Sequence, residues 1–373
     1  MDPEQLRADI PALDSAVYLN TGASSPSPRR VVDRVTDFAQ FFEYEAPVGQ
    51  GVYQVAWEIY EESRETIADF LGAQPHEIAL TQSTADGMNL IASALDLADE
   101  DTVVARTDLE HPAGILPWNR LSDLDDVEVR VMETNAGRLD RETVEAVAAE
   151  TDLFVFSSLT WTHGTRMPVA EISEIAHDAD ARVLVDAVQS PGQYPVDLHE
   201  WGADFVVGAG HKWLLGPWGS GFLYVAEEAM DALIPRRIGY RSVEEPADPE
   251  YEFKRGAPRF EVGTTSPLPH VGLAEAIDLL EEIGIERIES RIERLTDRLK
   301  DGLDDEQLLS PREYESGLVT FRVDDPDATV ERLREQGVIV RALPYPRAVR
   351  ASVHAFNDAS DVDALLAALD ETA

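Results

Sequence analysis

The residue of this chain best suited to covalent chemistry is Lys212. It follows His211 in the glycine-rich stretch 206–217, which begins as a β-branched run typical of a buried strand. Only three of the 31 basic residues are lysines, at positions 212, 254 and 300. A desolvated lysine can lose its proton and attack a carbonyl group, whereas arginine stays protonated. Lys212 is therefore a candidate nucleophile, although most lysines are solvated surface residues.

Three further polar side chains follow strand-like runs. Asp186 ends the run 183–185, Gln189 lies three residues beyond it, and His111 comes after the run 102–106. The carboxyl ends of neighbouring parallel strands meet at one edge of a sheet, so we expect Asp186 and Lys212 to share an edge. Each residue alone has a plainer interpretation: a helix N-cap for Asp186, a loop residue for Gln189 and His111. Their occurrence together favours a common site.

The elements that must position these residues alternate between strand and helix. This alternation predicts an α/β fold with a largely parallel sheet, helices on both faces, and ligands beyond the carboxyl ends of the strands. Strand-like runs occupy 77–81, 102–106, 127–132, 153–158, 183–185 and 206–209, and helical periodicity covers 29–45, 53–72, 84–91, 112–118 and 140–149.

The C-terminal quarter changes pattern. Helical periodicity is long from 270 to 301, with an interruption at Gly284, and short strands at 318–323 and 338–341 then alternate with helices at 327–336 and 360–371. A chain of 373 residues exceeds what one hydrophobic core usually serves. We therefore expect a large α/β domain at 17–285 and a smaller α+β domain at 286–373, together with 1–16.

Together these motifs resemble the class V aminotransferases, the fold-type-I pyridoxal-phosphate (PLP) enzymes that include cysteine desulfurases and isopenicillin N epimerase-like proteins. Asp186 and Gln189, followed by Lys212 in His-Lys, match the cofactor site of that family. The resemblance implies a mainly parallel seven-stranded sheet and PLP held as a Schiff base on Lys212. Asp186 would partner the pyridine nitrogen, Gln189 would reach the ring's 3-oxygen, and His111 would stack on the ring.

The resemblance also implies a phosphate anchor. Thr84 and Ala85 lie where a strand turns into a helix, and a helix N-terminus offers free N–H groups to an anion, although Ser83-Thr84 alone is more often only a cap. The family commonly has hydroxyl residues where this chain has Ala85 and Ala209, so backbone N–H groups and His211 would contribute more. Thr264, after Gly263, would reach the phosphate of a neighbouring subunit. A homodimer is therefore expected.

For the substrate, the resemblance assigns Arg350 to grip an α-carboxylate, with Arg341 at a further family position whose role is less certain. The backbone of Gly22 and Ala23 would edge the site, and Trp161 would form a bulky apolar wall where desulfurases carry an asparagine. A small-molecule amino acid is thus the expected substrate.

The reaction is expected to be transamination, with β-elimination or other lyase chemistry and α-epimerisation as alternatives that use the same lysine. A non-catalytic relative of the fold is a further alternative, which the presence of Lys212 and Asp186 disfavours. The chain has no cysteine. Because desulfurases use a cysteine nucleophile, we expect the protein not to be one of them.

Charge excludes several kinds of partner. With 31 basic and 72 acidic residues the net charge is −41, which disfavours nucleic acid and anionic membranes as partners.

No run of 18 apolar residues occurs and the N-terminus lacks an apolar core, so a cytoplasmic location is expected. The eight histidines are scattered, so no metal site is expected. The acidic excess and scarcity of lysine are typical of proteins adapted to high salt.

The charge leads to a first prediction. Salt at 1 M shortens electrostatic screening to ~3 Å, which relieves repulsion among the acidic side chains. The midpoint of thermal unfolding should therefore rise steeply between dilute buffer and molar KCl, as circular dichroism can measure. An unchanged midpoint would contradict the salt adaptation.

Overall fold

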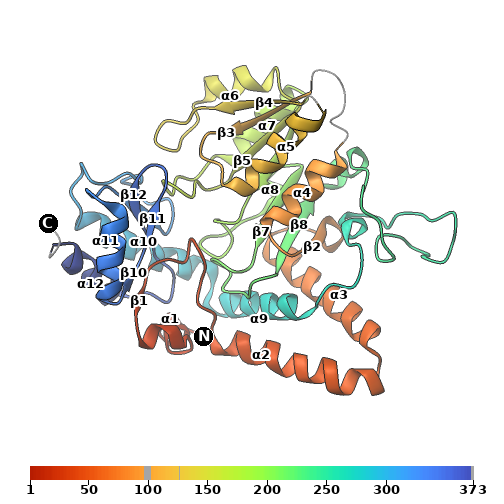
Figure 1. Ribbon diagram of the computed structural model, residues 1–373, viewed down its shortest axis with the longest axis horizontal. Helices are drawn as coiled ribbons and strands as arrows, with labels where there is room; N and C mark the ends of the chain where they lie inside the picture. Colours follow the sequence, from red (N-terminus) through yellow and green to blue (C-terminus); the bar gives the residue numbers. More distant parts are fainter. Residues whose placement is uncertain (96–101, 126, 371–373) are drawn as a thin grey trace.

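The computed structural model describes residues 1–95, 102–125 and 127–370. Within these ranges the central sheet consists of seven strands, namely β2 Ile78–Thr81, β3 Val103–Thr107, β4 Glu128–Met132, β5 Leu153–Ser157, β6 Arg182–Asp186, β7 Phe205–Ala209 and β8 Gly221–Val225. Their order is β2-β8-β7-β6-β5-β3-β4 (Figure 1). The strands β3 to β7 are parallel, and β8 runs antiparallel to both of its neighbours. The expected α/β fold with a mainly parallel seven-stranded sheet is confirmed.

Helices cover both faces of this sheet. The larger helices of this part are α2 Arg29–Gln40, α3 Val52–Phe70, α4 Thr84–Ala94, α5 Leu116–Asp125, α6 Arg141–Ala148, α7 Val169–Asp178 and α9 Leu268–Ile283. Two short helices, α1 Pro3–Ala8 and α8 Leu198–Trp201, complete it. In Figure 1, α2 and α9 run side by side below the sheet.

Strand β6 shows why the sheet is buried on both faces. Successive side chains of a strand point to opposite faces. Val183 and Val185 accordingly join one apolar cluster with residues of α3, α7 and α9, whereas Leu184 joins a second cluster with residues of α4 and α5. The continuous run of β-branched residues is thus the pattern expected for a parallel strand between two helix layers.

The C-terminal part has its own small sheet. Its strands are β9 Leu318–Phe321, β11 Arg341–Leu343 and β12 Ala348–Ser352, in the antiparallel order β11-β12-β9, and its helices are α10 Ile285–Asp301, α11 Pro326–Glu335 and α12 Ala359–Asp370. The strand β1 Val17–Tyr18 pairs in parallel with β10 Val338–Ile339 of this part. Figure 1 places these elements at one end of the molecule. The division of the chain near residue 285 stays a prediction.

No helix within the described residues is long and apolar enough to cross a membrane. The cytoplasmic location stays a prediction.

Candidate active site

The carboxyl edge of the central sheet brings Asp186 and Lys212 together. Asp186 is the last residue of β6, and Lys212 lies three residues after the end of β7, the next strand in the sheet. The loop between β7 and β8, which carries Lys212, is held by hydrogen bonds from Gly210 N to Ser220 O and from Gly216 N to Gly210 O, each 2.9 Å long. Lys212 therefore sits at the end of a buried strand and faces a cavity.

This cavity has a volume of about 280 Å³ and contains most of the predicted site. Ten of the predicted residues line it: Gly22, Ala23, Thr84, Ala85, His111, Trp161, Asp186, Gln189, His211 and Lys212. Two others lie apart. Arg350 is buried behind Trp161, and Thr264 is exposed on a loop where its hydroxyl lies 2.9 Å from that of Tyr240.

The surroundings of Lys212 favour its neutral form. Burial lowers the pKa of Lys212 to about 8; the charge of Asp186 opposes the shift, and those of Arg350 and Arg341 add to it. Burial raises the pKa of Asp186 to about 6, although its carboxylate accepts a 2.9 Å hydrogen bond from Val188 N and feels the charge of Lys212. A lysine of this kind can act as a nucleophile and as a base near neutral pH.

His111 stays neutral at the mouth of this cavity. Its Nδ1 accepts a 3.3 Å hydrogen bond from Ala113 N, and its ring lies edge-on to Trp161 with centroids 5.7 Å apart. Partial burial, followed by the charges of Lys212, Arg341 and Arg350, lowers its pKa to about 4. A neutral ring exposed to the cavity is suited to stacking on a planar ligand.

Gln189 connects two loops of the site. Its Oε1 accepts a 2.7 Å hydrogen bond from Trp213 Nε1, and its Nε2 donates a 3.0 Å bond to Gly22 O. The side chain thus ties the residue after Lys212 to the loop that edges the cavity. Its contact with the 3-oxygen of the cofactor stays a prediction, which would use the second amide hydrogen of Nε2.

Arg350 is a cation without an acidic partner in the part of the chain that the structure describes. It is fully buried on β12, opposite Arg341 on β11, and its Nη1 donates a 2.7 Å bond to Trp161 O. Among the described residues, nothing accepts a hydrogen bond from its Nε or Nη2. Burial, with the nearby charge of Arg341, lowers its pKa to about 9. Such a group is costly to bury unless an anion completes it.

The loop at Gly22 is built to approach this arginine. A Cβ atom at Gly22 would lie 2.9 Å from Arg350 Nη2 and 2.7 Å from a methyl carbon of Leu318. Any larger residue would therefore displace the guanidinium of Arg350 or the side chain of Leu318. Glycine at this position lets the backbone of the loop approach the unpaired edge of Arg350.

The start of α4 is suited to a phosphate. Ser83 caps this helix through a 3.2 Å bond from Asp86 N to its hydroxyl, and Thr84 Oγ1 is buried without a hydrogen-bond partner among the described residues. Free N–H groups of a first helical turn attract anions. The unpaired hydroxyl, the unpaired guanidinium of Arg350 and the Lys212–Asp186 pair together fit PLP and the carboxylate of a substrate.

Several residues of the site were not found from the sequence. Ser157 and Trp218 line the cavity, and the ring of Trp218 lies 4.6 Å from that of His211. Glu110 is buried beside Ser157 and hydrogen-bonds to it. No periodicity or motif marks these residues; only the position of Glu110 directly before His111 was a usable signal.

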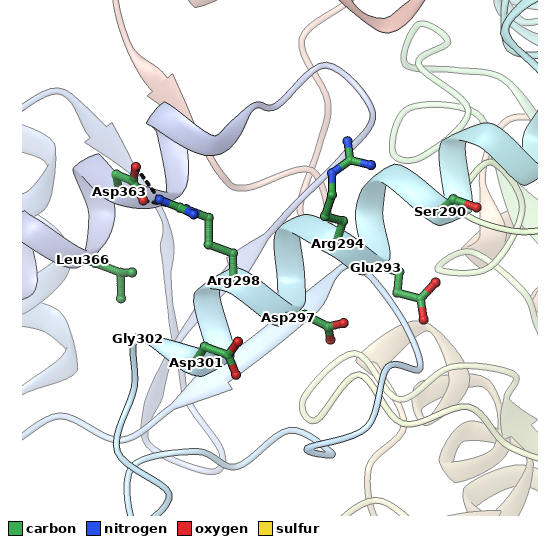
Figure 2. A pocket seen from close by; sticks show the side chains of 9 residues that line it. All are labelled: Ser290, Glu293, Arg294, Asp297, Arg298, Asp301, Gly302, Asp363 and Leu366. Carbon is green, nitrogen blue, oxygen red and sulfur yellow. Dashed lines mark hydrogen bonds and ion pairs between the residues drawn. The ribbon is translucent and has the colours of Figure 1, made fainter.

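A larger hollow lies elsewhere and has no comparable chemistry. An open pocket lies along α10 and α12, where Arg298 pairs with Asp363 (Figure 2). Its volume is about 600 Å³. Six of its nine lining residues are charged, and the nine are Ser290, Glu293, Arg294, Asp297, Arg298, Asp301, Gly302, Asp363 and Leu366. No group of three or more histidine, aspartate or glutamate side chains in the described part of the chain could hold a metal ion.

Fold and cavity together define a lysine-dependent PLP enzyme of the α/β type. The family Aminotransferase class-V matches residues 17–365, and the chain belongs to this family. A probable cysteine desulfurase of Pyrococcus abyssi is 32% identical, with 99% of this chain and 97% of that protein covered.

Solved structures agree with this assignment. The apo structure of a cysteine desulfurase from Thermococcus onnurineus NA1 has a TM-score of 0.92 and 30% identity, and covers 100% of this chain and 98% of its own. The cystine C-S lyase C-DES, in complex with its product cysteine persulfide, has a TM-score of 0.90 and 28% identity, with coverages of 96% and 98%. A C-DES variant contains glycine linked to its PLP cofactor. The expected fold type and the PLP cofactor are confirmed.

The expected reaction class needs correction. We expected an aminotransferase and placed the protein outside the desulfurases because the chain has no cysteine. The exclusion of desulfurases is wrong: full-length relatives at about 30% identity are named cysteine desulfurases. These names, and a structural neighbour that is a C-S lyase, support the lyase alternative better than transamination. The physical reason is that the same lysine and carboxylate serve transamination and elimination alike, so they do not select between them.

The electrostatics of Lys212 give a second prediction. In cofactor-free protein, the rate at which an amine reagent labels Lys212 should rise with pH through about 8. Asp186→Asn removes a charge that favours the protonated amine, so the midpoint should fall; Arg350→Met removes a repelling charge, so it should rise. Peptide mapping by mass spectrometry, with Lys254 as an internal standard, measures each rate. A midpoint near ~10.4, the usual value for lysine, would refute the effect of burial.

Proposed function

We propose that the protein is a PLP-dependent C–S lyase that cleaves the bond between the β-carbon and sulfur of a cysteine-type amino acid. The observation that carries this proposal is the unpaired, fully buried guanidinium of Arg350 beside the cavity of Lys212. It supports an amino-acid substrate, and the named activities of the relatives support cleavage at sulfur.

Different residues of the cavity have different roles in such a reaction. PLP, when bound, supplies an electron sink that stabilises negative charge at the α-carbon of an amino acid. Asp186 keeps a proton at the pyridine nitrogen, and Lys212 binds the cofactor and then removes the α-proton of the substrate. The lowered pKa of Lys212 makes its neutral, proton-accepting form available near neutral pH.

Arg350 orients the substrate. Its Nε and Nη2 can donate two parallel hydrogen bonds to an α-carboxylate, which fixes the α-proton relative to Lys212. Arg341 also faces the cavity, with its guanidinium 5.9 Å from the ring centroid of Trp161. The indole of Trp161 keeps water from this side of the cavity.

The fate of the sulfur follows from the composition. This chain has no thiol side chain, so the sulfur leaves on a product or passes to a thiol from outside the chain. In cystine the sulfur that leaves the β-carbon is already bonded to the sulfur of the other half of the molecule, so no further acceptor is needed. Lys212 takes the α-proton, and the electrons of the Cα–H bond form a double bond between the α- and β-carbons. The electrons of the Cβ–S bond leave with the sulfur, which departs as a persulfide. The remaining fragment hydrolyses to pyruvate and ammonia.

A homodimer completes the proposal. Apolar side chains are exposed in the segment between α2 and α3 and in the first turns of α3, where Tyr44 is 76%, Val48 88% and Trp57 50% exposed. Exposed apolar patches of this kind mark protein interfaces. Thr264 lies outside the cavity of its own chain, which is consistent with a role at the site of a second copy.

The third prediction tests this function. Purified protein loaded with PLP should convert cystine to pyruvate, ammonia and persulfide. Arg350→Met should lower kcat/KM by about 100-fold, or about 2.8 kcal/mol, because two charge-assisted hydrogen bonds are lost. Arg347→Met is the matched control: Arg347 lies near Arg350 in sequence but is exposed and pairs with Asp327, so its removal should change little.

Coupled assays for pyruvate and for sulfane sulfur give both rates. A stoichiometric oxo acid that retains the sulfur, formed only with an added amino acceptor, would contradict C–S cleavage. Equal rates with and without Arg350 would contradict its role at the carboxylate.

A further inference from the structure

Glu110 is a buried carboxyl group that the proposed reaction does not use. It directly precedes His111 and is only 4% exposed. Its Oε1 accepts a 2.6 Å hydrogen bond from Thr107 Oγ1 and a 3.1 Å bond from Ser157 N, and its Oε2 accepts a 2.7 Å bond from Ser157 Oγ. These three hydrogen bonds of the carboxyl group thus come from two residues at the edge of the sheet.

Those two residues are strand ends. Thr107 is the last residue of β3 and Ser157 the last of β5, the next strand in the sheet. Ser157 lies opposite Asp186 in the register between β5 and β6. Glu110 therefore fastens the loop after β3 to the strand that adjoins the position of Asp186.

The other side of the same loop is held by Trp161. Its Nε1 donates a 2.8 Å hydrogen bond to Leu109 O, and Leu109 N donates a 3.3 Å bond to Thr107 Oγ1. The ring of His111 itself is exposed to the cavity; it lies edge-on to Trp161, and its Nδ1 accepts the bond from Ala113 N. The direction of this ring is consequently set by the backbone that Glu110 and Trp161 hold.

We propose that Glu110 is a positioning residue that holds His111 against the face of the PLP ring in a fixed relation to Asp186 at its edge. This inference rests on the proposed placement of the ring between those two residues. Glu110 does not line the cavity, so in this proposal it acts through the backbone before His111.

The hydrogen bonds of Glu110 can hold the loop in place over the physiological pH range. Burial raises the pKa of Glu110 to about 7, the hydrogen bonds from Thr107 and Ser157 oppose the shift, and the charge of Asp186 adds to it. Both protonation states can be satisfied, because the hydroxyls of Thr107 and Ser157 rotate between donating and accepting. The loop therefore stays fastened when the carboxyl group gains or loses its proton.

The fourth prediction compares Glu110→Ala with Glu110→Gln in the PLP-loaded enzyme. The alanine variant loses all three contacts, so the circular dichroism of the bound cofactor should fall by at least about half and the Kd for PLP should rise about tenfold, or about 1.4 kcal/mol. The kcat should fall while KM stays nearly constant. Glutamine keeps an acceptor oxygen and the size of the side chain, so it should restore most of the signal.

The matched control is Glu77→Ala. Glu77 is also buried, accepts a 2.7 Å hydrogen bond from Gln74 N and contacts His199, and lies away from the cavity. This change should lower the unfolding midpoint and leave the cofactor signal unaltered. If Glu110→Ala does not fold, Ser157→Ala removes one of the three contacts and should give a smaller change of the same signal.

The outcomes separate this inference from the proposed function. A wild-type cofactor signal in folded Glu110→Ala, or an equal loss in Glu77→Ala, would overturn the role of Glu110. A normal cofactor spectrum without cleavage of cystine would instead contradict the proposed function, and the spectra of the Glu110 variants would still decide the inference.

Discussion

The parallel pairing of β6 with β7 is the constraint on which the site depends. It brings the carboxyl ends of both strands to one edge and so delivers Asp186 and Lys212 to the same cavity. Both strands are buried between helix layers, so their end positions are held by the core rather than by the loops. The same burial desolvates the two groups and shifts the pKa of the lysine downward and that of the carboxyl group upward.

The cavity has a charge balance opposite to that of the molecule. The chain carries a net charge of −41, yet Lys212, Arg341 and Arg350 lie close enough to repel one another, and Asp186 offsets only the charge of Lys212. Unpaired cations in a desolvated space attract anions strongly. Phosphate at the start of α4 and a carboxylate at Arg350 would supply the missing negative charge, so cofactor and substrate complete the electrostatics of the site.

Much of the fold followed from hydrophobic patterns, and the exceptions have physical reasons. The run 183–185 predicted β6 because strands buried on both faces are continuously apolar. Strand β8 was missed because Gly221–Val225 follows a glycine-rich loop that hides its start, and β12 was missed because it follows the proline-containing segment 344–346. The position of Arg350 therefore came only from the family resemblance.

The residues of the candidate site also divide into those that the sequence pattern predicts and those that it does not. Asp186 and Lys212 could be predicted because strand-end positions follow from periodicity, whereas Glu110 could not, since its partners Thr107 and Ser157 are adjacent only in the folded sheet. The reaction was misjudged because the absence of cysteine was treated as decisive. A missing thiol constrains where sulfur goes after cleavage, and it leaves the chemistry at the β-carbon open.

The central claim is that Lys212 holds the cofactor, and borohydride reduction of the PLP-loaded protein followed by peptide mapping tests it most directly. Reduction makes the bond between PLP and an amine permanent, and the chain has only three lysines to compare. We predict one label per chain, on Lys212, and none on the Lys212→Ala variant. A label on Lys254 or Lys300 would contradict the account.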